Sequence, residues 1–123
     1  MKKSFRALFL DKESRTLLKT FFPPTFEKVF GDHITLEHDV SDSREHFRAS
    51  ARVIGFMKDG QCEALMVELD NNAASLFKGS MAHVTLSCSK DTEPAHSKNL
   101  SQFNQPLSFN LVLMGTVRLN SEK

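Results

Sequence analysis

Hydrophobic and polar positions alternate over several short stretches of the chain, a pattern typical of half-buried β-strands. The longest stretch, residues 107–119, predicts a final strand that pairs within the sheet. Its apolar side chains fall on one face: Leu107, Phe109, Leu111, Leu113, Val117 and Leu119. Residues 49–58 and 61–69 flank Asp59-Gly60, a dipeptide typical of two-residue turns, and therefore predict a tight β-hairpin.

The beginning of the chain predicts a strand followed by a helix. Residues 4–10 are rich in apolar side chains and predict a buried first strand. Asp11 is a suitable N-cap for a short helix over residues 12–20, with Leu17 and Leu18 on its buried side. The Pro-Pro pair that follows should end this helix, because proline cannot continue the hydrogen-bond ladder.

Three further segments show helical signals. Apolar residues in segment 26–30 follow the i, i+3, i+4 spacing of a helical turn, which Gly31 would end. One helical turn is predicted over residues 73–77, and a helix over residues 93–103, with a proline in its first turn. The polar stretch 41–46 predicts a mobile loop or an irregular short helix beside the first motif.

Length and composition are those of one globular domain. The chain has 123 residues, of which 40% are hydrophobic and 25% charged, enough for one core. The pattern predicts a single α+β domain over residues 1–123 with an antiparallel sheet. A formal net charge of +1 argues against a broad grip on duplex nucleic acid, which requires a strongly basic face, but it allows a small phosphate pocket.

The sequence carries no secretion or membrane signal that we can identify. Arg6 interrupts the first apolar run, which then ends too early for a signal peptide, and no stretch is long enough to span a bilayer. We therefore expect a cytoplasmic protein, or a nuclear one, that is not secreted. Cys62 and Cys88 are then expected to be reduced core residues. The sequence does not define an oligomeric state, and we expect a monomer.

Two predicted strands carry the same four-residue pattern. Residues 33–36 read His-Ile-Thr-Leu and residues 83–86 read His-Val-Thr-Leu. Side chains two positions apart in a strand share a face, so each strand offers an imidazole and a hydroxyl together. These pairs are His33 with Thr35 and His83 with Thr85.

Chance does not easily explain this repetition. Five histidines and seven threonines in 123 residues give about 0.3 expected His-x-Thr triplets. The chain has two, and both continue with leucine after a β-branched central residue. The competing interpretation, two unrelated strands that each carry a surface histidine, is much less favoured.

The two motifs resemble the paired HxTx motifs of the two-histidine phosphoesterase superfamily. The likeness is greatest to the cyclic phosphodiesterase domain of fungal-type tRNA ligases, whose second motif is likewise followed by a polar turn and a helix start. Here residues 89–99 hold that place. The resemblance implies two lobes of antiparallel sheet with flanking helices, and a central cleft that carries both HxTx strands.

Two imidazoles and two hydroxyls can open a strained 2′,3′-cyclic phosphate without a metal. An ordinary imidazole pKa of about 6.5 lets one histidine accept a proton from water while the other protonates the leaving ribose oxygen. By analogy with the family, His83 is the base and His33 the acid. Thr35 and Thr85 would bind the phosphate oxygens. We therefore predict a metal-independent RNA 2′,3′-cyclic phosphodiesterase without a cofactor. The resemblance to tRNA ligases implies that it leaves a 2′-phosphate during RNA or tRNA repair or processing.

Other polar residues receive simpler interpretations. His38 falls on the opposite strand face from His33, which favours a core or edge role. His46 and His96 lie in polar segments and are expected to be solvated. The histidines lack the spacing of known zinc sites. Two lysines beside the second motif, Lys78 and Lys90, are expected to be surface residues rather than phosphate ligands.

Two other functions are compatible with these motifs. The same groups could hydrolyse 2′,5′-linked oligoadenylates or trim RNA 3′ ends, because the motifs define the phosphate chemistry and not the nucleoside. A nucleotide-binding module without catalysis is the non-enzymatic alternative. Such a module would not need an acid and a base. The expected partners are thus RNA ends or nucleoside 2′,3′-cyclic phosphates, and no membrane.

Overall fold

Strands dominate the computed structural model, which describes residues 3–38, 46–77, 81–93, 100, 104–106 and 111–122. The strands in these ranges are β1 (Lys3–Leu10), β2 (Lys28–Val29), β3 (His33–His38), β4 (Phe47–Lys58), β5 (Cys62–Leu69), β6 (His83–Cys88), β7 (Asn104–Pro106) and β8 (Val112–Glu122). The helices are α1 (Lys12–Phe21) and α2 (Asn71–Ala74). Neither of these helices is long and apolar enough to cross a bilayer.

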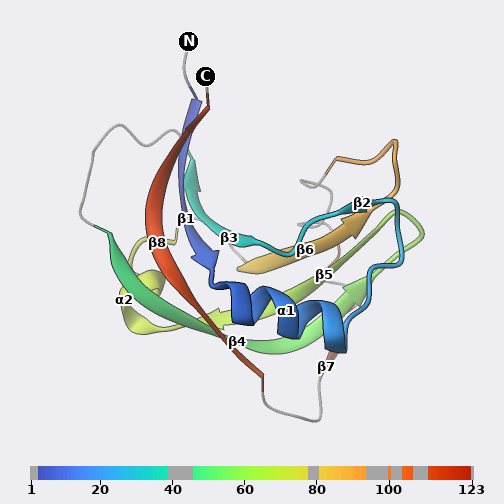
Figure 1. Cartoon of the computed structure of the whole chain (residues 1–123), viewed down its shortest axis with the longest axis horizontal. Coiled ribbons are helices and arrows are strands. Elements are labelled where there is room, and N and C mark those ends of the chain that lie inside the picture. The colour runs from blue at the N-terminus through green and yellow to red at the C-terminus, as the bar shows by residue number, and fades with distance from the viewer. Residues whose placement is uncertain are drawn as a thin grey trace.

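The described strands form one antiparallel sheet in the order β2-β6-β5-β4-β8-β1-β3, and β7 pairs with β4 outside this path. The long strand β4 joins two halves, since it pairs with β8 along its first part and with β5 along its second. We call β1, β3 and β8 the first half, and β2, β5 and β6 the second half (Figure 1). The predicted antiparallel α+β fold is confirmed, whereas the sheet is continuous rather than divided in two.

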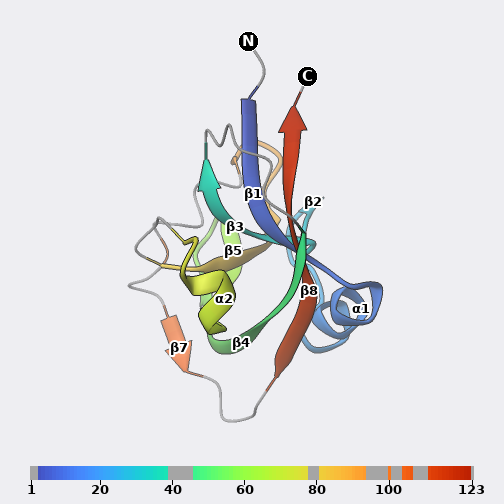
Figure 2. The ribbon, with the colours of Figure 1, turned by 90° about the vertical axis from the view of Figure 1, so that its left-hand side faces the viewer.

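The sheet is strongly curved. β3 is the edge strand of the first half and β6 lies next to the edge of the second, yet β3 and β6 are in contact. Figure 1 shows β1 and β8 on one side of the curve and β5 and β6 on the other. α1 contacts β8, while α2 contacts β4 and β5, and Figure 2 shows the two helices on either side of β4 and β8. The curvature therefore brings together the two strands that carry the motifs.

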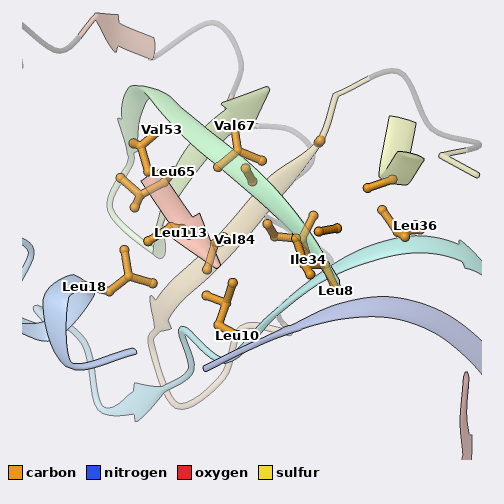
Figure 3. Packing of buried hydrophobic residues seen from close by; sticks show 14 of the residues in the cluster. Leu8, Leu10, Leu18, Ile34, Leu36, Val53, Leu65, Val67, Val84 and Leu113 are labelled. Carbon is orange, nitrogen blue, oxygen red and sulfur yellow. The ribbon is translucent and has the colours of Figure 1, made fainter. Parts of the chain in front are cut away.

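The main core lies against one face of this sheet (Figure 3). Leu18 of α1 joins it, and Ser14 fixes the helix by accepting a hydrogen bond of 2.8 Å from the Met114 backbone N–H. Each buried aliphatic side chain of this kind contributes about 1.5–3 kcal/mol. The members labelled in Figure 3 are Leu8, Leu10, Leu18, Ile34, Leu36, Val53, Leu65, Val67, Val84 and Leu113.

The first helix and its N-cap residue, Asp11, agree with the prediction, but the Asp11 side chain does not cap the helix. α1 begins after Asp11 and ends just before the Pro-Pro pair, with Leu18 buried. Leu17 is exposed, contrary to expectation, because the buried side of this short helix is narrow. The Asp11 carboxylate makes no capping hydrogen bond and instead accepts two hydrogen bonds from Arg48, at 2.6 and 2.8 Å.

The predicted helical turn over residues 26–30 was wrong. This segment forms the short strand β2, which pairs with the free side of β6, and Val29 is exposed. The Phe30 N–H donates to the Leu86 carbonyl at 2.8 Å, so backbone hydrogen bonds to β6 replace those of a helix. Gly31 does end the segment as predicted, with a φ of 91° that glycine adopts readily.

The hairpin between β4 and β5 is confirmed, although its turn lies one residue later than predicted. The Asp59 N–H donates to the Cys62 carbonyl at 3.0 Å, so Gly60 and Gln61 form the tip. The Asp59 carboxylate accepts hydrogen bonds from the backbone N–H groups of Gln61 and Cys62.

Of the remaining predicted elements, one helical turn and most of the final strand lie within the described residues. α2 starts two residues earlier than expected, because the Asp70 carboxylate caps it by accepting from the Ala73 N–H at 2.9 Å. β8 extends the predicted final strand to Glu122 and pairs with both β1 and β4. The helix over residues 93–103, the loop over 41–46 and the start of the final strand lie almost entirely outside the described residues.

The expectation of reduced cysteines was wrong. Cys62 and Cys88 are directly opposed on β5 and β6 and form a disulfide, with their Cα atoms 4.2 Å apart. Both are fully buried in a smaller core cluster with Met57, Ala64 and Leu100. Spacing along the chain did not reveal this pairing, because it depends on the register of the two strands.

Candidate functional site

Each HxTx motif opens its strand. β3 starts at His33 and β6 starts at His83, so both histidines have the same place in their strands. Side chains then alternate as predicted, with the histidines and threonines partly exposed and the aliphatic residues between them buried. The buried residues are Ile34, Leu36, Val84 and Leu86.

The partner strands repeat the correspondence. Ala7 on β1 lies opposite Thr35, and Ala64 on β5 lies opposite Thr85. A β-bulge follows each threonine, at the leucine that ends the motif. Since a small side chain opposes each threonine, the hydroxyl is not crowded from that side.

A buried charged residue lies beyond each bulge. In the first half, Arg6 is 2% exposed and forms an ion pair with Glu37. In the second half, Glu63 is also 2% exposed and accepts a hydrogen bond from the hydroxyl of Ser87. Glu63 also accepts hydrogen bonds from the backbone N–H and the hydroxyl of Thr25, at 2.7 and 3.0 Å. These contacts fix each motif strand to its neighbour.

His33 lies in a polar and aromatic environment. Its Nδ1 is 2.8 Å from the Asp32 carboxylate, which can only accept, so Nδ1 carries the proton and donates. This hydrogen bond holds the pKa of Asp32 below its usual value. The imidazole also contacts the rings of Phe5 and Phe9, at centroid distances of 5.6 and 5.7 Å. These contacts orient the ring, and Nε2 is the ring nitrogen that does not bond to Asp32.

His83 is likewise partly buried. Its Nδ1 lies 3.3 Å from the Met81 carbonyl, so Nδ1 again carries the proton in this contact. Burial lowers the pKa of His83 below its usual value, and the charge of His33 lowers it further, while the bond to Met81 opposes both. β3 and β6, the strands that carry the two histidines, are in contact.

The other histidines and lysines considered from the sequence are exposed or have side chains outside the described residues. His46 and Lys90 are exposed. The side chain of His38, and His96 and Lys78 altogether, lie outside the described residues. In the described ranges, no group of three or more His, Cys, Asp or Glu side chains is placed to hold a metal ion.

Three residues near His33 were missed from the sequence. Asp32 directly precedes the motif, and a carboxylate beside a candidate acid was a signal that could have been used. Phe9 and Arg118 lie close by, with the Arg118 guanidinium 4.2 Å from the centre of the Phe9 ring. Their proximity depends on the pairing of β1 with β3 and β8, which no local pattern predicts.

Comparison with known proteins adds no assignment. No protein-family model matches the chain, and a search of curated proteins found no match.

Proposed function

We propose that this protein is a metal-independent 2′,3′-cyclic phosphodiesterase that opens cyclic phosphates at RNA ends during RNA or tRNA repair or processing. The observation that carries the proposal is the equivalent placement of two His-x-Thr pairs on contacting strands. The two halves of the sheet would act as the lobes of a two-histidine phosphoesterase. The cleft would lie between β3 and β6.

His83 is the base in this mechanism. Its lowered pKa favours the neutral imidazole near pH 7, and the proton on Nδ1 leaves the lone pair on Nε2. A water molecule attacks the phosphorus and transfers its proton to this atom. A base that is neutral at the working pH is available in nearly every molecule.

His33 is the acid. The Asp32 carboxylate accepts its Nδ1–H bond and compensates the positive charge of an imidazolium. As the bond between phosphorus and the ribose 3′-oxygen breaks, Nε2 of His33 gives its proton to that oxygen. The products are a 2′-phosphate and a free 3′-hydroxyl. Proton transfer between the histidines through solvent then restores the starting state.

Thr35 and Thr85 bind the non-bridging oxygens of the phosphate. Both side chains share a strand face with the histidine of their motif, and each lies opposite an alanine. Hydroxyl donors held in this way stabilise the negative charge that develops in the pentacovalent transition state.

Incubation with nucleoside 2′,3′-cyclic monophosphates and short RNAs ending in a cyclic phosphate, in excess EDTA, tests the proposal. We expect turnover to 2′-phosphate products, identified by ³¹P NMR. Parallel incubations contain 2′,5′-linked oligoadenylates and RNAs with ordinary 3′ ends. Turnover of these substrates alone would show that the protein does not act on cyclic phosphates. Binding without turnover would indicate a nucleotide-binding module. Activity that EDTA abolishes and zinc or manganese restores would contradict the mechanism.

A further inference from the structure

Arg118 shares a sheet face with the first motif. Ala7 on β1 is directly opposite Thr35 on β3 and directly opposite Arg118 on β8. Directly opposed residues of antiparallel strands project to the same face, so these three residues form one row across the first half. Arg118 is exposed, and the small side chain of Ala7 separates it from Thr35.

Arg118 differs from other arginines of the sheet in its electrostatic partner. Arg6, Arg48 and Arg52 each form an ion pair with a carboxylate, from Glu37, Asp11 and Glu68 respectively. Among the described residues, no carboxylate lies within ion-pair range of Arg118. Its guanidinium instead lies over the ring of Phe9, which orients the group but does not neutralise its charge.

Phe9 connects this arginine to the proposed acid. The Phe9 ring centre is 4.2 Å from the Arg118 guanidinium carbon and 5.7 Å from the centre of the His33 imidazole. A single aromatic ring therefore lies between the cation and His33. A guanidinium positioned like this binds phosphate through two parallel hydrogen bonds, which a lysine cannot reproduce.

The second half has no counterpart to this cation. Met57 on β4 lies opposite Ala64, as Arg118 lies opposite Ala7, and Met57 is fully buried. The chemistry of cyclic-phosphate opening uses both halves, whereas an arginine is present in the first half alone. This asymmetry is expected of a residue that recognises the rest of the substrate rather than the reacting phosphate.

We propose that Arg118 binds the phosphate on the 5′ side of the terminal nucleotide, the next negative charge along an RNA chain. This inference rests on the proposed function, and it names the substrate class: RNA ends rather than free nucleoside cyclic phosphates. Phe9 holds the guanidinium beside the site.

Two substrates that differ only in the 5′-phosphate test this assignment. Adenosine 2′,3′-cyclic phosphate lacks that group, and its 5′-phosphorylated form carries it. Wild-type protein should have the higher kcat/KM for the 5′-phosphorylated substrate. Arg118→Met should lower kcat/KM for that substrate by about 10 to 100-fold, the loss of a hydrogen bond to a charged group, and leave the other nearly unchanged. Arg118→Lys should recover only part of the loss.

Arg52→Met is the matched control, since it removes another exposed arginine of the same sheet. It should leave the preference between the two substrates unchanged. An equal loss on both substrates, or no loss on either, in a folded Arg118→Met protein would overturn the assignment while the phosphodiesterase activity stands. If the wild-type protein opens neither substrate, the proposed function itself fails, and this inference with it.

Discussion

The two halves of the sheet carry the same framework in different surroundings. Each has a His-x-Thr strand, an alanine opposite the threonine, a bulge at the following leucine and a buried charged residue beyond it. In the first half, the histidine contacts a carboxylate and two aromatic rings, and an exposed arginine lies over one of these rings. In the second half, the histidine bonds to a backbone carbonyl, and burial lowers its pKa.

In the proposed mechanism, this difference lets one residue type serve two opposite roles. Two groups of the same residue type can act as acid and base when one environment favours the protonated form and the other favours the neutral form. Asp32 beside His33 suits a proton donor, and the desolvation of His83 suits a proton acceptor. The resemblance implies the same assignment, and the role of each histidine stays a prediction.

The largest effect is expected where the first half is most closely packed. A side chain at Gly115 would place its Cβ 2.2 Å from the Phe9 carbonyl oxygen, so β1 and β8 could not keep their present distance. Gly115→Ala should lower the free energy of unfolding by more than about 3 kcal/mol, measured by urea denaturation. Gly60→Ala is the control, because nothing lies within 4 Å of that position. Equal stability of the two variants would contradict the close approach.

The buried charged residues give the next comparison. Glu37→Ala leaves Arg6 buried without its carboxylate, which should cost about 3 kcal/mol of unfolding free energy. Glu63→Ala leaves the Thr25 and Ser87 donors without their acceptor and should cost about 1–3 kcal/mol. Chemical denaturation of both variants measures the two costs. An unchanged stability in either variant would show that its half does not depend on that contact.

The threonines should affect catalysis and not folding. Thr35→Ala and Thr85→Ala each remove one hydroxyl from the transition-state phosphate, so turnover should fall about 10 to 100-fold. Thr→Ser at either position returns the hydroxyl and should restore much of the rate. Loss of activity in the serine variants as well would point to the methyl group, and thus to packing.

The smallest effect tests the coupling between the halves directly. His33→Gln removes a positive charge that lowers the pKa of His83, so that pKa should rise. It should still remain below its usual value, because burial is the larger cause. An NMR titration of the His83 ring proton measures the change, and His46→Gln is the control. If the pKa of His83 is the same in wild-type protein and in His33→Gln, the two imidazoles lie too far apart to share one phosphate.

Local sequence patterns predicted the structural features that depend on residues close together in the chain. Alternation identified β3, β6 and the final strand, the Asp-Gly signal located the β4–β5 hairpin, and Asp11 with the Pro-Pro pair bounded α1. The two motifs with their four site residues were visible for the same reason, since His and Thr two positions apart share a face whatever the fold.

Features that depend on distant strands were missed. Segment 26–30 has helical spacing, but hydrogen bonds to β6 make it a strand. Cys62 and Cys88 meet because of the β5–β6 register, including its bulge. Arg118 is joined to the first motif by β1, a strand more than one hundred residues earlier in the chain. The shared strand β4 likewise makes one sheet where two were expected.

Turnover of adenosine 2′,3′-cyclic phosphate by the histidine variants tests the central claim most directly. His33→Ala and His83→Ala should each lower kcat by about 10² or more while the circular dichroism spectrum stays unchanged, and the double variant should be little worse than either, because acid and base serve one transition state. His46→Ala, at an exposed position, should keep near-normal turnover. Near-normal turnover in either folded single variant of the motif histidines would contradict the account.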